Sequence, residues 1–194
     1  RLTEFEIIRA AHQIGVAVPH PIAASADLAI IGAPFMVVGR VAGSAQARKL
    51  VRDPGLAGFG EALAGELGRQ LARLHRLTPS TPGVTVRDRL PLPGLAPGRQ
   101  QAAQMRGHLD NLTVARPALE YVIGWLDRNA PEAAGLVLCH GDFRTGNYMV
   151  DNGRLSGLLD WEFAHWGDRH EDIAWLTARC WRFGAVGREA GGIG

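Results

Sequence analysis

The segment from residue 136 to residue 160 constrains the fold of this chain more than any other part. It contains apolar runs at 136–139, 148–150 and 155–159, which predict three short strands. Asp151-Asn152-Gly153 separates the second run from the third, and such a pair of runs around Asn-Gly is a strong signal for a β-hairpin. The sequence therefore predicts a strand, a polar loop and a hairpin in succession.

The polar loop reads His140-Gly141-Asp142-Phe143-Arg144-Thr145-Gly146-Asn147, so an aspartate stands five positions before an asparagine. The Asp142 carboxylate can orient an attacking hydroxyl or accept its proton. The Asn147 amide oxygen can hold a hard cation. We therefore interpret Asp142 as a catalytic carboxylate and Asn147 as a metal ligand.

Asp160, at the end of the hairpin, offers a second ligand. If Val150 lies opposite Leu155, then Asp160 lies opposite Thr145, a diagonal step of about 7–8 Å from Asn147. A site with few protein oxygen ligands suits Mg²⁺, which keeps waters and phosphate oxygens as its other ligands. The spacing thus predicts a Mg²⁺ site between Asn147 and Asp160.

Two other interpretations of these residues are weaker. An aspartate and an asparagine in a turn usually make local Asx hydrogen bonds, but here they belong to a longer set that also includes a histidine, a hairpin and a second aspartate. A zinc hydrolase would use His140, His165 or His170, yet none of them has the H-E-x-x-H spacing of a zinc-binding helix with its general base.

The remaining sequence predicts a small strand-containing part, residues 1–43, and a larger helical part, residues 44–194, that carries the hairpin. A loop with five prolines, at 78–97, interrupts the helical part. The final glycines, 191–194, predict a flexible end. Helices are expected at 3–14, 44–51, 59–77, 98–113, 115–129 and 168–183, and further strands at 28–31 and 34–41.

Composition narrows the possible partners and location. The formal net charge is +2, so nothing points to nucleic acid or an anionic membrane as a partner. No apolar run approaches the length of a membrane span. Cys139 and Cys180 are too few for a disulfide framework, which favours a reducing cytoplasm. The pattern does not address the oligomeric state.

The loop and hairpin resemble the aminoglycoside phosphotransferase and choline kinase family, which shares the protein-kinase-like fold. Protein kinases carry H-R-D-x-x-x-x-N followed by D-F-G. This chain has H-G-D-x-x-x-x-N at 140–147 and Asp160-Trp161-Glu162, the forms typical of that family. The stretches 180–184 and 191–194 are similar to the branch whose kinase-like domain is also found fused to acyl-CoA dehydrogenases.

The resemblance implies an α+β, two-lobe fold with an incomplete small lobe and a mainly helical large lobe. It implies ATP and Mg²⁺ as cofactors and a small-molecule hydroxyl as phosphoryl acceptor. The backbone of Gly39, Arg40 and Val41 would receive adenine, and Glu4 would pair with a phosphate-binding lysine. Asp172 would anchor the catalytic loop.

One half of such a site is missing from the sequence. A phosphoryl-transfer site of this kind also needs a glycine-rich loop and a lysine that bind the nucleotide phosphates. Lys49, the only lysine, comes after the expected hinge. The glycine-rich loop and its lysine are therefore expected before Arg1 in a longer protein, or are absent. Two hypotheses follow: an ATP-dependent small-molecule kinase, which the three retained residues favour, or a non-catalytic kinase-like binding module. The few acidic residues near the site argue against a polycationic acceptor.

Overall fold

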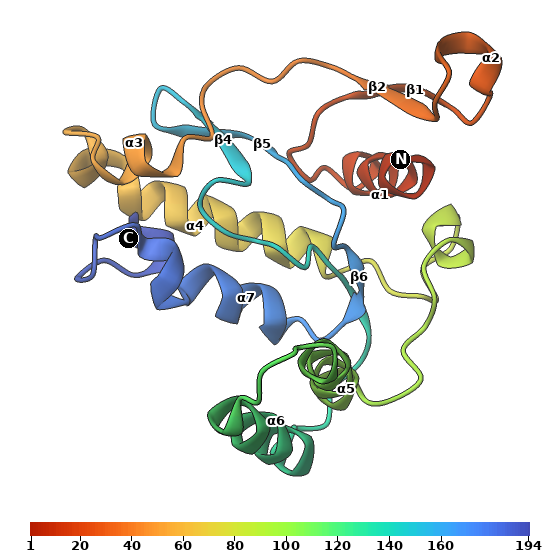
Figure 1. The fold of residues 1–194 in the computed structure, drawn as a ribbon. Helices are drawn as coiled ribbons and strands as arrows, with labels where there is room; N and C mark the ends of the chain where they lie inside the picture. The colour runs from red at the N-terminus through yellow and green to blue at the C-terminus, as the bar shows by residue number, and fades with distance from the viewer.

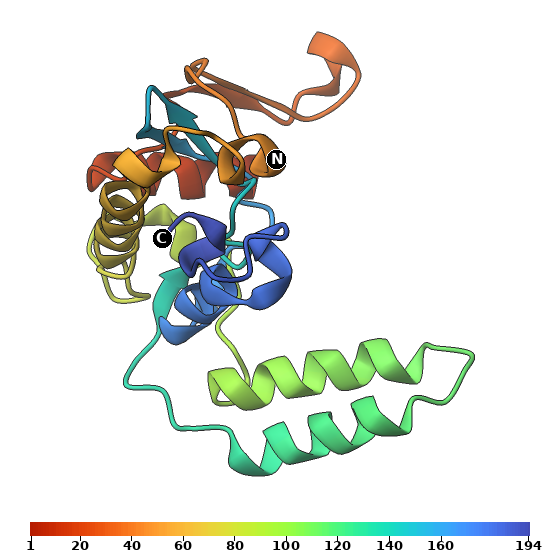
Figure 2. The same cartoon turned by 90° about the vertical axis from the view of Figure 1, so that its left-hand side faces the viewer.

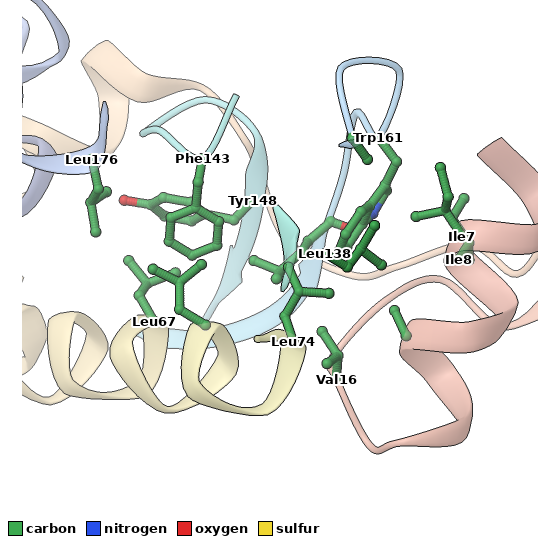
Figure 3. Packing of buried hydrophobic residues seen from close by; sticks show 14 of the residues in the cluster. Ile7, Ile8, Val16, Leu67, Leu74, Leu138, Phe143, Tyr148, Trp161 and Leu176 are labelled. Atoms are coloured by element: carbon green, nitrogen blue, oxygen red, sulfur yellow. The ribbon is translucent and has the colours of Figure 1, made fainter. Parts of the chain in front are cut away.

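The structure, a computed structural model that describes residues 1–194, is arranged around the long helix α4 (Leu56–Leu74). Its leucines at positions 63, 67, 71 and 74 recur at helical spacing and are all buried. Together with residues of α1 (Leu2–Gln13), the strands and α7 (His170–Thr177), they form one core of 22 buried residues. Figure 3 shows Leu67 of α4 beneath Phe143 and Tyr148, and Leu74 beneath Leu138.

Two antiparallel strand pairs lie against α4 and α7 and carry the polar loop between them (Figure 1). The first joins β3 (Val137–Cys139) to β6 (His165–Gly167), and the second is the hairpin of β4 (Tyr148–Asp151) and β5 (Arg154–Leu158). The loop thus leaves β3 and enters β4. Strand β6 was not expected from the sequence.

The hairpin register confirms that Val150 lies opposite Leu155, but the expected position of Asp160 is wrong by one residue. A bulge between Met149 and Val150 shifts the pairing. The Leu159 N–H consequently donates to the Asn147 carbonyl at 2.8 Å, which places Asp160 across from Gly146. The bulge thus moves Asp160 one position along the ladder relative to Asn147, and the left-handed backbone of Asp160 (φ 66°) takes it out of the regular strand alternation.

The N-terminal part consists of α1 (Leu2–Gln13), β1 (Pro21–Ser25), α2 (Leu28–Ile31) and β2 (Phe35–Val38). β1 and β2 form a third antiparallel pair. The expected strand at 28–31 is wrong, because this apolar run forms a single helical turn. The Asp27 side chain caps that turn through the Ala29 N–H, and Gly32 ends it in the left-handed conformation.

Two helices project from the rest of the molecule as an antiparallel pair (Figure 2). They are α5 (Pro97–Asp110) and α6 (Pro117–Asn129), each with proline in its first turn. The remaining helices are α3 (Ala47–Val51), α7 (His170–Thr177) and three short 3₁₀ turns at Thr85–Asp88, Arg179–Arg182 and Ala190–Gly192. The expected final helix therefore ends earlier than predicted. No helix is both long and apolar enough to cross a membrane.

The C-terminal glycines do not form the flexible end that was expected. Gly191, Gly192 and Ile193 are buried, and the Gly191 carbonyl accepts a hydrogen bond from the Thr145 hydroxyl at 2.9 Å. Both glycines have positive φ, a conformation that most other residues avoid. The last residues therefore pack directly against the polar loop.

Candidate active site

The loop between β3 and β4 is fixed from behind by Asp172 of α7. Its two carboxylate oxygens accept the His140 N–H at 2.9 Å and the Gly141 N–H at 3.0 Å. His75, just after α4, contacts the same carboxylate at 2.9 Å. Burial alone would raise the pKa of Asp172, but these hydrogen bonds outweigh burial and lower it. The anchoring role expected for Asp172 is confirmed.

His140 packs inside the core behind the loop. Its ring is fully buried between Phe143 and Trp161, with ring centroids 5.7 and 4.5 Å away. One ring nitrogen lies 2.9 Å from the Leu159 carbonyl. Burial lowers the pKa of the imidazole. His140 thus connects the loop to the end of β5, next to Asp160.

Asp142 lies near the start of the loop, and three side chains donate hydrogen bonds to its carboxylate. Trp175 Nε1 donates to Oδ1 at 2.6 Å, and Arg144 Nε lies 3.0 and 3.1 Å from the two oxygens. Asn147 Nδ2 donates to Oδ2 at 2.5 Å. A carboxylate held by this many donors has a fixed direction, from which an oxygen can accept a hydrogen bond from a hydroxyl.

The oxygen atoms expected to bind Mg²⁺ have no protein partner. Asn147 uses its amide nitrogen on the carbonyl and carboxylate of Asp142, which leaves its Oδ1 available. Asp160 is exposed and makes no side-chain hydrogen bond. It adopts φ 66°, which is uncommon for a residue other than glycine and often marks a functional position. An amide oxygen and a free carboxylate fit a magnesium ion.

The expected hinge runs beside β5. A Cβ atom on Gly157 would lie 3.1 Å from the Val41 side chain, so that glycine lets the hinge approach the strand. The Gly39 N–H already donates to the His20 carbonyl at 2.8 Å. The backbone groups of Arg40 and Val41 have no such partner. Two of the three expected adenine-binding positions thus have free backbone groups, and Gly39 keeps only its carbonyl.

Glu4 of α1 is paired with Arg1, at 2.7 Å, in the absence of the expected lysine. It lines a cavity of about 220 Å³ together with Trp161 and Glu162, which directly follow Asp160. Lys49 lies elsewhere, beside Asn152 and Gly153 at the turn of the hairpin. Lys49 does not line the cavity beside Glu4, where the phosphate-binding lysine is expected.

Sequence reasoning missed the partners of the loop. Trp175 is 40% exposed and its indole N–H bonds to Asp142. The His75 side chain is only 7% exposed and contacts Asp172. Arg144 braces the loop, with its guanidinium 4.5 Å from the centre of the Trp181 ring.

Comparison with known proteins supports the resemblance. A model described as the phosphotransferase enzyme family matches residues 2–194. Acyl-CoA dehydrogenase family member 10 of Mus musculus is 29% identical over 178 residues, which cover 89% of this chain and 16% of that protein. The chain therefore spans only a small part of the length of this curated relative.

Two solved structures share the fold. A putative aminoglycoside phosphotransferase from Ralstonia eutropha has a TM-score of 0.76 at 22% identity, over 99% of this chain and 60% of its own. The aminoglycoside phosphotransferase APH(4)-Ia, in a ternary complex with ADP and hygromycin B, has a TM-score of 0.61 at 17% identity, over 97% of this chain and 63% of its own. The α+β, kinase-like fold expected from the sequence is confirmed.

Proposed function

Because the chain belongs to the phosphotransferase enzyme family, we propose that it is the catalytic part of an ATP-dependent small-molecule kinase, which moves the γ-phosphoryl group to a hydroxyl. The observation that carries this proposal is the loop and hairpin geometry. Asp142 is held by three side-chain donors. Asn147 and Asp160, at the end of the ladder that pairs β4 with β5, each keep a side-chain oxygen without a protein partner.

Each residue has a distinct part in this proposal. Asp142 orients the acceptor hydroxyl and takes up its proton, while Arg144 and Trp175 hold the carboxylate in place. Asn147 Oδ1 and the Asp160 carboxylate would hold Mg²⁺, which neutralises the charge of the phosphate groups when it is bound. Phosphoryl transfer of this kind depends chiefly on positioning and on charge stabilisation.

The nucleotide would lie between the two parts of the chain. We assign residues 1–43 to the remainder of the nucleotide-binding lobe and the hinge, and residues 44–194 to the large lobe. Adenine would meet the free backbone groups of Arg40 and Val41 and the Gly39 carbonyl. Glu4 would meet the phosphate-binding lysine that this sequence lacks, in place of its contact with Arg1.

The acceptor proposed here is a small molecule with a hydroxyl group, handled in the cytoplasm. The related APH(4)-Ia was solved with hygromycin B, which makes antibiotics one class to test. Neither nucleic acid nor a membrane is proposed as a partner, because the formal net charge is only +2.

A non-catalytic binding module is the second candidate. It is favoured by the missing phosphate-binding lysine, since Lys49 is the only lysine and lies at the far end of the hairpin. Such a module would bind Mg-ATP or another ligand without transferring phosphate. The two candidates differ in turnover and need not differ in binding.

The deciding experiment measures phosphate transfer from Mg-ATP by the full-length protein to a panel of small hydroxyl compounds. Asp142→Ala should lower the turnover number by about 10²–10⁴-fold, the usual contribution of a positioned acid or base. Asp151→Asn is the matched control, because this carboxylate lies on the hairpin without a side-chain hydrogen bond. Equal turnover in the Asp142→Ala and unmodified proteins would rule the kinase out. Mg-ATP binding without transfer to any acceptor would favour the module.

A further inference from the structure

Behind the polar loop, three side chains from three different elements converge. Cys139 ends β3, His165 begins β6 opposite it in the ladder, and Glu171 lies in the first turn of α7. One ligand atom of each, Sγ, Nε2 and a carboxylate oxygen, lies within 4.8 Å of the other two. We call these residues the Cys139–His165–Glu171 cluster. It shares no residue with the proposed phosphoryl-transfer site.

The histidine of this cluster is oriented as a metal ligand usually is. His165 Nδ1 lies 2.9 Å from the Phe163 carbonyl and donates its hydrogen there, so Nε2 is the ring nitrogen that faces the other two side chains of the cluster. Nε2 faces the Glu171 Oε2 at 3.1 Å. Two lone pairs at this distance repel each other unless a cation or a proton lies with them. Metal-bound histidines typically donate their other ring N–H to a carbonyl in this way.

A glycine keeps the space between these ligand atoms open. A Cβ atom on Gly167 would lie 2.8 Å from His165 Nε2 and 3.1 Å from Cys139 Sγ. Gly167 is not among the residues with positive φ, so its backbone conformation does not require glycine. The absent side chain leaves room for an ion beside Nε2 and Sγ.

The surroundings of the cluster also favour a cation. Burial raises the pKa of the Cys139 thiol, and the carboxylates of Asp172, Glu171 and Asp168 raise it further. In the absence of metal the thiol therefore keeps its proton and donates to the Asp168 carbonyl at 3.3 Å. The same negative charges attract a divalent ion, which would displace the thiol proton to solvent.

We propose that Cys139 Sγ, His165 Nε2 and Glu171 Oε2 bind a zinc ion. One thiolate, one imidazole and one carboxylate form a donor set typical of Zn²⁺. With Zn–N and Zn–O bonds of about 2.1 Å at a tetrahedral angle, the N···O separation is roughly 3.4 Å, close to the 3.1 Å between His165 and Glu171.

Water completes the coordination from a neighbouring cavity. This cavity, of about 420 Å³, is lined by His165, Gly167 and Gln101 of α5. The Gln101 amide nitrogen already lies 3.3 Å from His165 Nε2 and from both Glu171 oxygens. It can hydrogen-bond a water in the fourth position, while the ion takes over the charge balance of the cluster.

A second group around Cys139 is a poorer site. His75, Cys139 and Asp172 also lie within the same 4.8 Å limit. However, the Asp172 oxygens already interact with three groups, the His140 N–H, the Gly141 N–H and the His75 ring. A metal there would have to break the contacts that hold the loop, whereas the Cys139–His165–Glu171 cluster leaves them intact.

The position of the cluster gives the ion a structural role. Cys139 directly precedes His140, and Glu171 directly precedes Asp172, so the ion would join β3, β6 and α7 at the point where Asp172 holds the loop. This inference is independent of phosphoryl transfer and survives if the chain is only a binding module.

The test uses Co²⁺ and Zn²⁺ with the full-length protein stripped of metal by a chelator. One equivalent of Co²⁺ per chain should give a sulfur-to-cobalt charge-transfer absorption in the near ultraviolet, and Zn²⁺ should displace it. At free Zn²⁺ a hundred times its dissociation constant, the unfolding midpoint should rise by about 5–10 °C.

Matched variants identify the ligands. Cys139→Ser should abolish the cobalt absorption, while Cys180→Ser, which changes the exposed free cysteine, should retain it. His165→Gln and Gly167→Ala should weaken Zn²⁺ binding at least tenfold, the latter by filling the space for the ion. Absence of stoichiometric binding, or an absorption that survives Cys139→Ser, overturns the proposal. So does loss of binding in His75→Gln with retention in His165→Gln.

Discussion

Two aspartates of the polar loop region illustrate how surroundings separate structural from chemical roles. Asp172 is completely buried, and its carboxylate is surrounded by two backbone N–H groups and the His75 ring. Asp142 is almost as buried, at 8% exposure, but it lies beside the exposed Trp175 at the loop surface. Asp172 therefore holds the loop, whereas Asp142 lies where the proposed function needs a carboxylate.

Replacement of the anchoring carboxylate should therefore cost stability. In Asp172→Asn, one oxygen becomes an amide nitrogen that faces a backbone N–H, and the charge that balances the donors is lost. We expect the free energy of unfolding to fall by about 3–5 kcal/mol, as when one partner of a buried charged group is removed. Urea unfolding measures this, with the exposed Asp127→Asn as control, which should change stability by less than about 0.5 kcal/mol. Equal values for the two variants would contradict the anchoring role.

The indole of Trp175 should matter for turnover rather than for folding. Trp175→Phe keeps a ring next to Trp181, 5.4 Å away between centroids, but removes the donor to Asp142 Oδ1. Loss of one hydrogen bond to a charged group corresponds to about 1.5–3 kcal/mol, so the turnover number should fall roughly 10–100-fold.

The chain offers a close control for that indole. Trp181 Nε1 is buried without a hydrogen-bond partner, so Trp181→Phe removes a donor that bonds nothing and keeps a ring under Arg144. Turnover should change little. A similar fall in both variants would show that ring size, and not the bond to Asp142, accounts for the Trp175 effect.

Residues of the candidate site could be predicted from the sequence only where they lie close together along the chain. Asp142, Asn147 and Asp160 are connected by one loop and one hairpin, so their spacing alone brought them together. Trp175 reaches Asp142 from 33 residues away, and His75 reaches Asp172 from 97 residues away. Nothing in local periodicity determines such contacts, because they depend on how α4 and α7 pack.

At the scale of elements, α4 and the C-terminal segment approach each other more closely than a side chain allows. A Cβ atom on Gly60 would lie 2.1 Å from the Ile193 carbonyl oxygen. The Gly191 carbonyl of the same segment accepts a hydrogen bond from the Thr145 hydroxyl of the loop. Gly60 thus lets α4 support the end of the chain that packs on the candidate site.

Two glycines of the same helix should respond oppositely to alanine. Gly60→Ala should lower the free energy of unfolding by about 1–3 kcal/mol, since Ile193 must move away. Gly68→Ala meets no atom within 4 Å and should raise it by about 0.5–1 kcal/mol, because alanine favours helix. Thermal or urea unfolding of both variants checks the pair. A gain in stability from Gly60→Ala would contradict the close packing of the C-terminal segment.

Helices and strands were predicted correctly where the hydrophobic pattern was long, and the prediction failed where that pattern was short. The four leucines of α4 cover most of a 19-residue helix, so that prediction is confirmed apart from its ends. The run at 28–31 is too short for strand and helix to be distinguished by periodicity, although Asp27 before it and Gly32 after it are helix-capping residues. Strand β6 has three residues and pairs with a strand more than 25 positions earlier, which local sequence does not specify.

At the scale of the whole molecule, one buried glutamine connects the N-terminal part to α4. Gln70 is 3% exposed, and its Oε1 accepts the Ala17 N–H at 2.8 Å. The Ala17 carbonyl in turn accepts the Leu158 N–H of β5 at 2.7 Å. On the other side, Gln70 donates to Glu66 at 2.5 Å. This chain of bonds holds the segment after α1 against the hairpin that carries the site.

Gln70→Leu should break this connection and leave the Ala17 N–H without a partner. The free energy of unfolding should fall by about 1–3 kcal/mol, whereas Gln104→Leu, at an exposed position without a side-chain hydrogen bond, should change it by less than about 0.5 kcal/mol. Urea unfolding near neutral pH measures both. No difference between the two variants would mean that the buried amide does not stabilise the N-terminal part.

The pH dependence of the same variant provides a second readout. Hydrogen bonds from Gln70 and then Arg69 lower the pKa of Glu66 below its ordinary value of 4.5. A lowered folded-state pKa contributes stability that is present above pH 4.5 and is lost as the pH falls through the lowered value. Because Gln70→Leu removes the main donor, the variant has less of this contribution to lose. The stability gap between the unmodified protein and Gln70→Leu should therefore narrow below pH 4.5, and a gap that stays constant down to pH 3 would exclude Glu66 from the connection.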